Sequence, residues 1–238
     1  MQKVAIVTGG SSGIGRETAL ALHRAGCRVY EFSRHSAAPE GVIHISCDVA
    51  DEKQFEESVR LVESREGRID LLINNAGFGI SGAAEFTQNA DAHRLLEVNL
   101  FGMVNGCKAV LPIFRKQGSG RIVNVSSFAA LTPIPFQAWY SVSKAAVSAY
   151  TAALRNEVRP FGIQLCAVLP GDIRTGFTAA REKSPVGDGI YNGRISRSVA
   201  VMERDEKTGM DPAKAGRSIA ALALRRSVKP EYVIGASY

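Results

Sequence analysis

Apolar and polar residues alternate along this chain in a pattern that is typical of an α/β protein. Short runs rich in β-branched residues are separated by longer stretches with helical periodicity or many alanines. The short runs predict seven strands, at residues 3–8, 28–33, 42–47, 69–74, 120–125, 163–169 and 231–234. The longer stretches predict helices at residues 14–25, 51–66, 88–116, 138–158 and 212–226.

Several of these strands are apolar throughout, as in Val4-Ala5-Ile6-Val7 and Leu71-Leu72-Ile73. Continuous apolar strands are expected where a parallel sheet is buried on both faces. We therefore expect an α/β fold of the Rossmann type: a doubly wound, mostly parallel seven-stranded sheet with helices on both faces. A chain of 238 residues fits a single dinucleotide-binding and catalytic domain, residues 1–238.

Residues 176–210 depart from this pattern. Gly, Pro, Ser, Arg and Lys accumulate there and the helical period weakens. The segment follows the sixth strand, so it begins at the carboxyl end of the sheet, where open α/β folds bind ligands. We predict a substrate lid, with an ordinary surface loop as the alternative.

Composition excludes several classes of protein. No run of about 18 apolar residues appears, so we expect no membrane span. The first strand begins too early to leave room for a signal peptide, which favours a cytoplasmic protein. The four cysteines, far apart and without a CxxC pair, indicate a reduced protein with neither disulfides nor a metal site. These cysteines are Cys27, Cys47, Cys107 and Cys166.

The formal net charge of +6 raises the question of nucleic acid. Lys and Arg are spread along the chain and form no cluster interleaved with aromatic residues, which favours an ordinary solvated surface. We therefore expect no nucleic-acid partner. The same charge favours anionic ligands, including a phosphorylated dinucleotide.

A glycine-rich turn, Thr8-Gly9-Gly10-Ser11-Ser12-Gly13-Ile14-Gly15, joins the first strand to the first helix. Such a turn lets the backbone approach a pyrophosphate, and the helix N-terminus offers free N–H groups. The predicted cofactor contacts are Gly9, Ser11, Ser12, Gly13, Ile14 and Gly15. The pattern Gly9-x-Ser11-x-Gly13 also matches a hydrolase nucleophile elbow, but that enzyme needs a histidine far downstream, and all four histidines lie within the first 93 residues.

The end of the second strand discriminates between the two nicotinamide dinucleotides. An acid there binds the ribose 2′-OH and repels a 2′-phosphate. Eighteen residues after Gly15 this position is Ser33, followed by Arg34, which can grip a phosphate; Arg16 is a second candidate cation. These residues predict NADP(H). Glu31 keeps NAD(H) as the alternative, because a strand end two residues earlier would make it the acid.

Tyr140 and Lys144 stand four residues apart on a predicted helix and therefore share one face. An ammonium group beside a phenol stabilises the phenolate and lowers its pKa. Tyr140 is thus a candidate general acid for a ketone or base for an alcohol.

With these two residues, Thr8-Gly9-xxx-Gly13-Ile14-Gly15, Asn74-Asn75-Ala76-Gly77 and Pro170-Gly171 resemble the motifs of the short-chain dehydrogenase/reductase family, in the same order and spacing over residues 3–175. The C-terminal sequence 230–238 resembles the hydroxysteroid and retinol dehydrogenase-like branch.

The resemblance implies a catalytic tetrad of Asn99, Ser127, Tyr140 and Lys144. Ser127, thirteen residues before Tyr140, matches the serine that binds the substrate oxygen, and this register favours it over Ser126. Asn99 matches the asparagine that kinks a helix and holds a water molecule in the proton relay.

Further cofactor contacts follow from the same resemblance. It implies that Tyr140 and Lys144 also hold the cofactor, together with Asp48, Val49, Asn75, Ala76, Gly77, Pro170, Gly171, Ile173 and Thr175. It also implies a homodimer or homotetramer that pairs through the helices near 88–116 and 138–158.

These observations predict an NADP(H)-dependent oxidoreductase that moves a hydride between the nicotinamide and a secondary alcohol or ketone. Apolar loops favour a hydrophobic substrate, such as a steroid, retinoid or lipid-like carbonyl compound. These loops contain Phe78-Gly79-Ile80, Phe128, Leu131, Pro133-Ile134-Pro135-Phe136, Ile173 and Phe177. The alternative is a catalytically silent dinucleotide sensor or scaffold, which we would expect to have lost Ser127, Tyr140 or Lys144.

Overall fold

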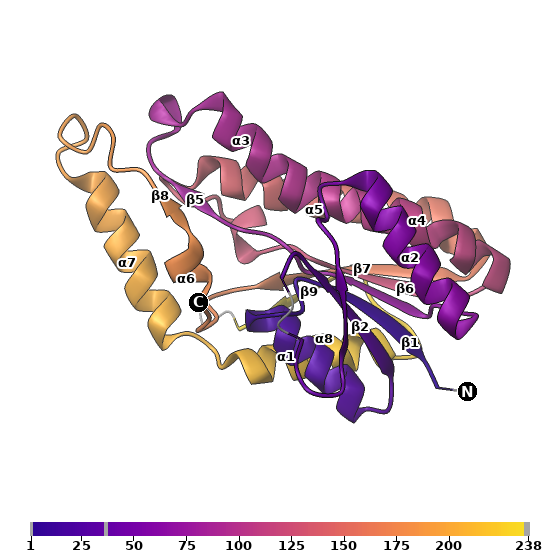
Figure 1. Cartoon of the computed structure of the whole chain (residues 1–238). Helices are drawn as coiled ribbons and strands as arrows, with labels where there is room; N and C mark the ends of the chain where they lie inside the picture. Colours follow the sequence, from indigo (N-terminus) through magenta and orange to yellow (C-terminus); the bar gives the residue numbers. More distant parts are fainter. Residues whose placement is uncertain (1, 36–37, 236–238) are drawn as a thin grey trace.

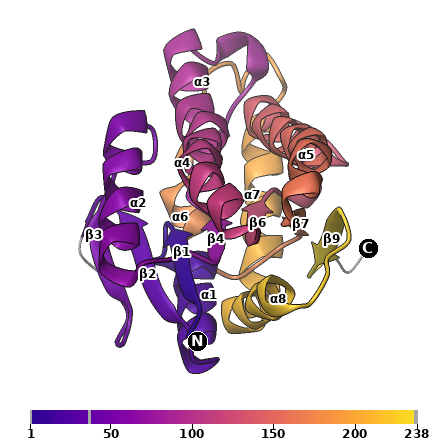
Figure 2. The same ribbon diagram turned by 90° about the vertical axis from the view of Figure 1, so that its right-hand side faces the viewer.

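The computed structural model describes residues 2–35 and 38–235, and its centre is a seven-stranded sheet between two layers of helices (Figures 1 and 2). The strand order is β3-β2-β1-β4-β6-β7-β9, and every pairing is parallel. The strands are β1 (Val4–Thr8), β2 (Arg28–Ser33), β3 (Ile43–Ser46), β4 (Leu71–Asn74), β6 (Gly120–Val125), β7 (Ile163–Pro170) and β9 (Glu231–Ile234).

The strand order reverses direction at β1, since the chain builds outward to β3 and then returns to β4 on the other side. In open α/β sheets this switch point opens a crevice at the carboxyl ends of the strands. The predicted fold class is confirmed, and all seven predicted strands are present. Residues 236–238, part of the C-terminal sequence used for the branch resemblance, lie outside the described residues.

Helices cover both faces of the sheet (Figure 2). On one face lie α1 (Gly13–Arg24) and α8 (Pro212–Leu224); on the other lie α2 (Glu52–Glu66), α4 (Gly102–Gln117) and α5 (Ala138–Val158). Successive side chains of a strand point to opposite faces of the sheet, so they pack alternately against the two layers of helices. Ala5 and Val7 belong to the core with α1 and α8, whereas Ile6 belongs to the core with α2, α4 and α5. The continuous apolar strands thus fill two cores at once.

The helix predicted at 88–116 is interrupted around Asn99, the residue at which the family resemblance implies a kink. It consists of α3 (Asn89–Leu96), a π-helical turn at Glu97–Phe101 and α4. Asn99, in this turn, accepts a hydrogen bond from Phe78 N at 3.0 Å and donates one to Phe78 O at 2.9 Å. The widened turn aims the amide of Asn99 at the loop after β4, and π turns of this kind often mark functional positions.

The lid segment (residues 176–210) is more regular than its sequence indicates. It contains α6 (Phe177–Ala180), β8 (Glu182–Lys183) and α7 (Arg194–Thr208), and β8 pairs in parallel with β5 (Ile80–Ser81) (Figure 1). The prediction of weak helical order was wrong for α7. Among the residues of α7 only Ile195 is buried, so this helix contributes little to the core.

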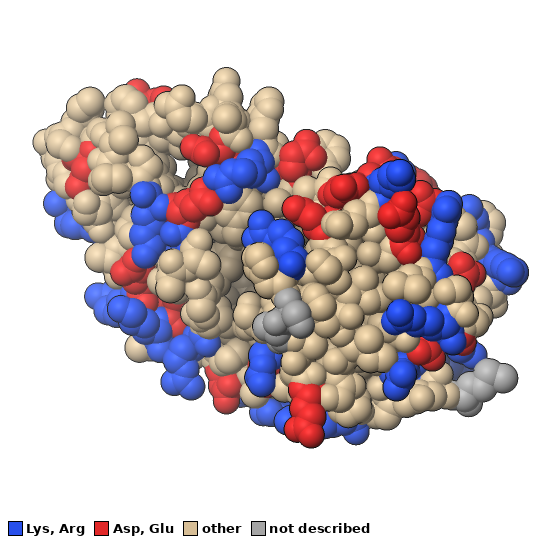
Figure 3. Space-filling view, viewed as in Figure 1, with Lys and Arg blue, Asp and Glu red and all other residues tan. Residues whose placement is uncertain are grey.

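Short 3-10 turns complete the fold at Ala84–Phe86, Phe128–Ala130 and Arg159–Phe161. The four cysteines are buried and unpaired. Within residues 2–35 and 38–235, none of the helices combines the length and apolar character that a membrane crossing requires, and no cluster of metal-binding side chains occurs. On the face shown in Figure 3, Lys and Arg are interspersed with Asp and Glu.

Candidate active site

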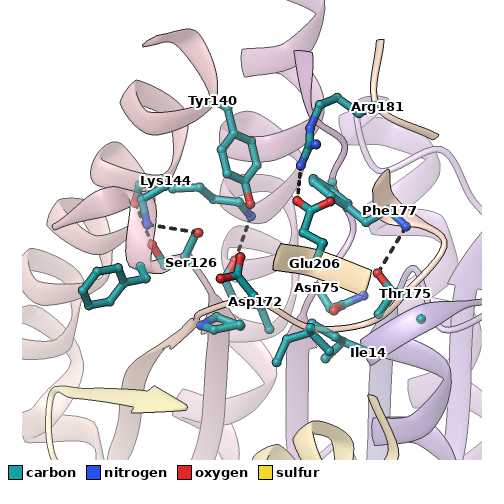
Figure 4. A pocket seen from close by; sticks show the side chains of 18 of the residues that line it. Ile14, Asn75, Ser126, Tyr140, Lys144, Asp172, Thr175, Phe177, Arg181 and Glu206 are labelled. Carbon is teal, nitrogen blue, oxygen red and sulfur yellow. Dashed lines mark hydrogen bonds and ion pairs between the residues drawn. The ribbon is translucent and has the colours of Figure 1, made fainter. Parts of the chain in front are cut away.

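A cavity of about 480 Å³ opens at the carboxyl ends of the central strands (Figure 4). Its walls come from the glycine turn after β1, the loops after β4, β6 and β7, the first turns of α5, and the lid segment. The parallel strands deliver all these segments to one edge of the sheet. Predicted site residues as far apart in the sequence as Gly9 and Thr175 therefore line the same cavity.

The glycine turn packs tightly against the segment after β4. Gly9 has a φ of +63° and approaches Ala76 so closely that an added Cβ would lie 3.0 Å from the Ala76 Cα. A Cβ on Gly15 would overlap the carbonyl oxygen of Gly9. The hydroxyl of Thr8 accepts hydrogen bonds from the backbone N–H groups of Asn75 and Ala76, at 2.9 and 3.0 Å. The two cofactor motifs thus form one rigid unit.

The N-terminus of α1 faces the cavity. Ser12, Gly13 and Ile14 line the cavity, no acidic residue occurs in the first turn of α1, and the Ser12 side chain makes no capping hydrogen bond. The positive end of the helix dipole is therefore left for a ligand. A cradle of this shape and polarity fits the pyrophosphate of a dinucleotide.

Ser127, Tyr140 and Lys144 all line the same cavity. Ser127 ends the strand-to-turn segment after β6, and its hydroxyl accepts a hydrogen bond from Ala129 N at 3.1 Å. Tyr140 and Lys144 project from one face of α5, as their spacing predicts (Figure 4). Ser126 also lines the cavity, but its hydroxyl is already engaged: it donates to Lys144 O at 2.8 Å and is 2.9 Å from Ser148 Oγ.

Lys144 is held in a buried position beside Tyr140. Lys144 is 5% exposed, its Nζ donates to Val125 O at 3.0 Å, and burial lowers its pKa to about 8. Its Nζ lies 5.8 Å from the centroid of the Tyr140 ring.

The pKa of Tyr140 is raised by burial, whereas a hydrogen bond with Ser127 and the positive charge of Arg181 act in the opposite direction. In this structure the pKa of the phenol therefore shifts upward, contrary to the sequence-based expectation, because desolvation outweighs the nearby charges.

Asn99 is buried and lies behind the cavity rather than in its lining. Besides its two bonds to Phe78, its amide donates to Ser143 Oγ at 3.2 Å, on α5 between Tyr140 and Lys144. Its Oδ1 would lie 2.9 Å from a Cβ added to Gly77. Asn99 thus connects the loop after β4 to the helix that carries the tyrosine and the lysine.

The predicted cofactor residues divide into two groups. Eleven of them line the cavity besides Tyr140 and Lys144: Gly9, Ser12, Gly13, Ile14, Asn75, Ala76, Gly77, Pro170, Gly171, Ile173 and Thr175. The others lie outside it: Ser11, Gly15, Ser33, Arg34, Asp48 and Val49. Four of these six residues, Ser33, Arg34, Asp48 and Val49, lie at or just after the ends of β2 and β3.

Glu31 is not at the end of β2, because the strand continues to Ser33. Glu31 is fully buried opposite His44 of β3 and contacts its Nδ1. Ser33 Oγ donates to Glu31 Oε1 at 3.3 Å and to His35 O at 3.0 Å. Arg34 follows the strand and is exposed. The residues that close the strand are therefore a hydroxyl and a guanidinium group.

The substrate side is more polar than the sequence predicted. Of the expected apolar loops, only Phe128, Ile134, Ile173 and Phe177 line the cavity. Phe78, Gly79, Ile80, Leu131, Pro133, Pro135 and Phe136 do not. Four polar or charged residues that sequence reasoning missed lie in the lining instead: Gln137, Asp172, Arg181 and Glu206. No motif marks them, since Arg181 and Glu206 lie in the poorly patterned lid segment.

This fold and cavity define a dinucleotide-binding protein of the Rossmann type. The family model described as short chain dehydrogenase matches residues 3–185, and the chain belongs to the short-chain dehydrogenase/reductase family. The resemblance seen in its motifs is confirmed at the level of the family. The chain is accordingly an oxidoreductase that uses a nicotinamide cofactor.

Relatives support this assignment. The chain is 40% identical to a 3-ketodihydrosphingosine reductase of Bacteroides thetaiotaomicron, covering 94% of this chain and 85% of the relative. It superimposes with a TM-score of 0.87 on a short-chain dehydrogenase from Streptomyces avermitilis, at 34% identity, covering 99% of this chain and 89% of that one.

Two further solved structures carry a cofactor. ElxO with NADP bound gives a TM-score of 0.81 at 27% identity, covering 98% of this chain and 97% of ElxO. A 3-ketoacyl-(acyl-carrier-protein) reductase from Brucella melitensis complexed with NADH gives 0.83 at 25% identity, covering 99% and 97%. Both nicotinamide dinucleotides therefore occur among similar structures.

Proposed function

We propose that this chain is an NADP(H)-dependent oxidoreductase acting on a ketone or secondary alcohol, with Tyr140 as its general acid or base. The observation that carries the proposal is the common cavity of Ser127, Tyr140, Lys144 and the glycine turn. When bound, the nicotinamide supplies or accepts the hydride. The keto group in the name of the Bacteroides relative is consistent with this substrate class.

The chain's own residues would then handle the substrate oxygen. Tyr140 gives a proton to this oxygen during reduction, and the upward shift of its pKa keeps it protonated at neutral pH. Ser127, hydrogen-bonded to Tyr140, donates to the same oxygen as negative charge develops there. Lys144 and Asn99 hold the tyrosine helix in position through their bonds to Val125 O and to Phe78.

The test of this proposal is turnover by the purified protein, followed through NADPH absorbance with a panel of ketones. Tyr140→Phe keeps the ring that packs against Phe177 at 5.7 Å and removes only the proton donor. We expect turnover to fall at least about a hundredfold, with the NADPH Kd unchanged. Wild-type protein that binds NADPH but reduces no carbonyl compound would instead support a silent sensor.

The preference for NADP(H) rests on the end of β2. An exposed Arg34 after Ser33 can bind a 2′-phosphate, whereas Glu31 is buried inside the strand and its Oε1 contacts His44 and Ser33. Arg16 is paired with Glu17 at 2.6 Å and is less free to take part. We expect Arg34→Ala to raise the KM for NADPH about tenfold or more and to leave the KM for NADH within about twofold. Equal effects on the two cofactors would refute the assignment.

We also propose assembly into a homodimer or homotetramer through α4 and α5. Phe101, at the start of α4, and Val142, on α5, are 47% and 50% exposed. Sedimentation velocity would check this proposal, and a Val142→Glu variant should shift the protein towards the monomer.

A further inference from the structure

Arg181 is an unusual residue to find in the wall of this cavity. Its side chain is 1% exposed and its guanidinium group contacts the carboxylate of Glu206, whose second oxygen accepts a hydrogen bond from Thr178 Oγ1. Its Nε and Nη1 have no hydrogen-bond partner among the residues that the structure describes. Buried N–H groups of a charged side chain are rarely left without acceptors, because desolvation makes them costly.

The surroundings hold this guanidinium group next to the reacting centre. Its Cζ lies 5.5 Å from the centroid of the Phe177 ring, and that ring lies 5.7 Å from the ring of Tyr140 (Figure 4). Gly79 packs against both side chains: a Cβ added to it would lie 3.5 Å from Arg181 Nε and 3.1 Å from Phe177 Cζ. The glycine thus lets the loop after β4 close over Arg181. The position of the guanidinium group is fixed by packing and by Glu206.

The ion pair also determines which ligand fits. Glu206 lines the cavity too, and it balances the charge of the guanidinium group. A carboxylate or phosphate placed on Nε and Nη1 would approach the negative charge of Glu206. An uncharged oxygen acceptor meets the N–H groups without that repulsion.

We propose that Arg181 is a specificity residue that binds a second, uncharged oxygen of the substrate, so that the preferred substrate is a ketone with a carbonyl acceptor a few bonds from the reacting carbon. This inference rests on the proposed function and narrows its substrate class. The apolar residues Phe128, Ile134 and Ile173 remain available for the hydrocarbon part of the same molecule. Arg181 would make no contact with the reacting oxygen.

The experiment compares 2-oxo, 3-oxo and 4-oxo esters with simple ketones of equal chain length. We expect the wild-type enzyme to favour one of the oxo esters over its matched ketone by about 10- to 100-fold in kcat/KM. Arg181→Met should remove this preference, lowering kcat/KM for the ester by that factor and for the simple ketone less than about threefold. Arg181→Lys should keep only part of the preference for the oxo ester, because a lysine cannot present two fixed donors.

A matched control separates recognition from a loosened lid. Arg94 pairs with Glu182, the residue that follows Arg181 in the chain, and lies outside the cavity lining. Arg94→Met should change the oxo ester and the ketone by the same small factor. If Arg181→Met also affects both substrates equally, or weakens NADPH binding as much as ester turnover, Arg181 is a structural or cofactor residue and the inference is wrong.

Glu206→Gln tests the charge argument directly. This substitution leaves the guanidinium charge unbalanced. The ratio of kcat/KM for the oxo acid to kcat/KM for its oxo ester should therefore rise about tenfold or more. An unchanged ratio of acid to ester would overturn the part of the inference that assigns an uncharged acceptor.

Calorimetric binding of the matching hydroxy ester to the NADPH-saturated protein, a pair between which no hydride can pass, makes the Arg181 comparison independent of turnover. If no ketone is reduced, the proposed function fails, and loss of this binding in Arg181→Met still supports Arg181. Equal binding by the wild type and the variant refutes its role.

Discussion

Replacing Lys144 with Met should stabilise the cofactor-free protein at neutral pH, although Lys144 belongs to the proposed catalytic group. Its side chain is buried and desolvation lowers the pKa of its ammonium group from 10.5 to about 8. The shift of roughly 2.5 units means that burying the charge costs roughly 3 kcal/mol of folding free energy. The variant also loses the bond to Val125 O, worth about 1 to 2 kcal/mol. We therefore expect a net gain of about 1 to 2 kcal/mol.

The gain should depend on pH in a definite direction. Below pH 8 the lysine is protonated in both the folded and the unfolded protein, so the full cost of the buried charge is present. Between pH 8 and 10.5 the unfolded chain keeps the proton that the folded protein has released, and wild-type stability rises with pH. Above pH 10.5 both states are neutral, and the variant should be less stable because only the lost hydrogen bond remains.

Urea denaturation followed by circular dichroism at pH 7 and pH 10 measures this difference. Lys214→Met, at an exposed position on α8, is the control and should change the free energy of unfolding by less than about 0.5 kcal/mol at both pH values. A Lys144→Met variant that is less stable than the wild type at pH 7, or whose gain does not shrink by pH 10, would show that the buried lysine is not a cost to folding.

Two other substitutions test how the site is supported. Gly15→Ala would place a Cβ against the Gly9 carbonyl, so NADPH affinity should fall at least about tenfold, whereas Gly189→Ala, with open space around it, should leave it unchanged; fluorescence titration compares them. Arg121 is buried on β6 and donates to Leu222 O and Ala223 O, each at 3.1 Å, at the C-terminus of α8. Arg121→Met should cost about 3 kcal/mol in urea unfolding, and a loss below about 1 kcal/mol would contradict this role.

Much of the scaffold could be predicted from the sequence because its signals are local. A strand buried on both faces has to be apolar at nearly every position, so the central strands stand out without an alignment. The turn from Thr8 to Gly15 can also be recognised in the sequence, because its close backbone contacts require glycine. The sequence spacing of Ser127 and Tyr140 correctly predicted that both residues line the cavity, because β6, its turn and α5 follow one another directly.

Other features depend on contacts between distant residues. The interruption at Asn99 depends on its two bonds to Phe78, 21 residues away, and periodicity alone continues through it. The helix α7 buries only Ile195, and it makes ion pairs with other parts of the lid segment, such as Lys183–Glu203. The pKa of Tyr140 depends on how deeply the phenol is buried, so the presence of Lys144 four residues later was insufficient to predict its direction.

The cavity separates reaction chemistry from substrate recognition along the chain. Ser127, Tyr140 and Lys144 come from β6 and α5, whose packing into the sheet core leaves little freedom to change. Arg181 and Glu206 come from the lid segment, which has few buried apolar residues and lies outside both cores. Substitutions in the lid can therefore alter the charge and shape facing the substrate without changing either core of the sheet. A change of substrate in this fold is expected to begin with residues such as Arg181, while the proton donor stays in place.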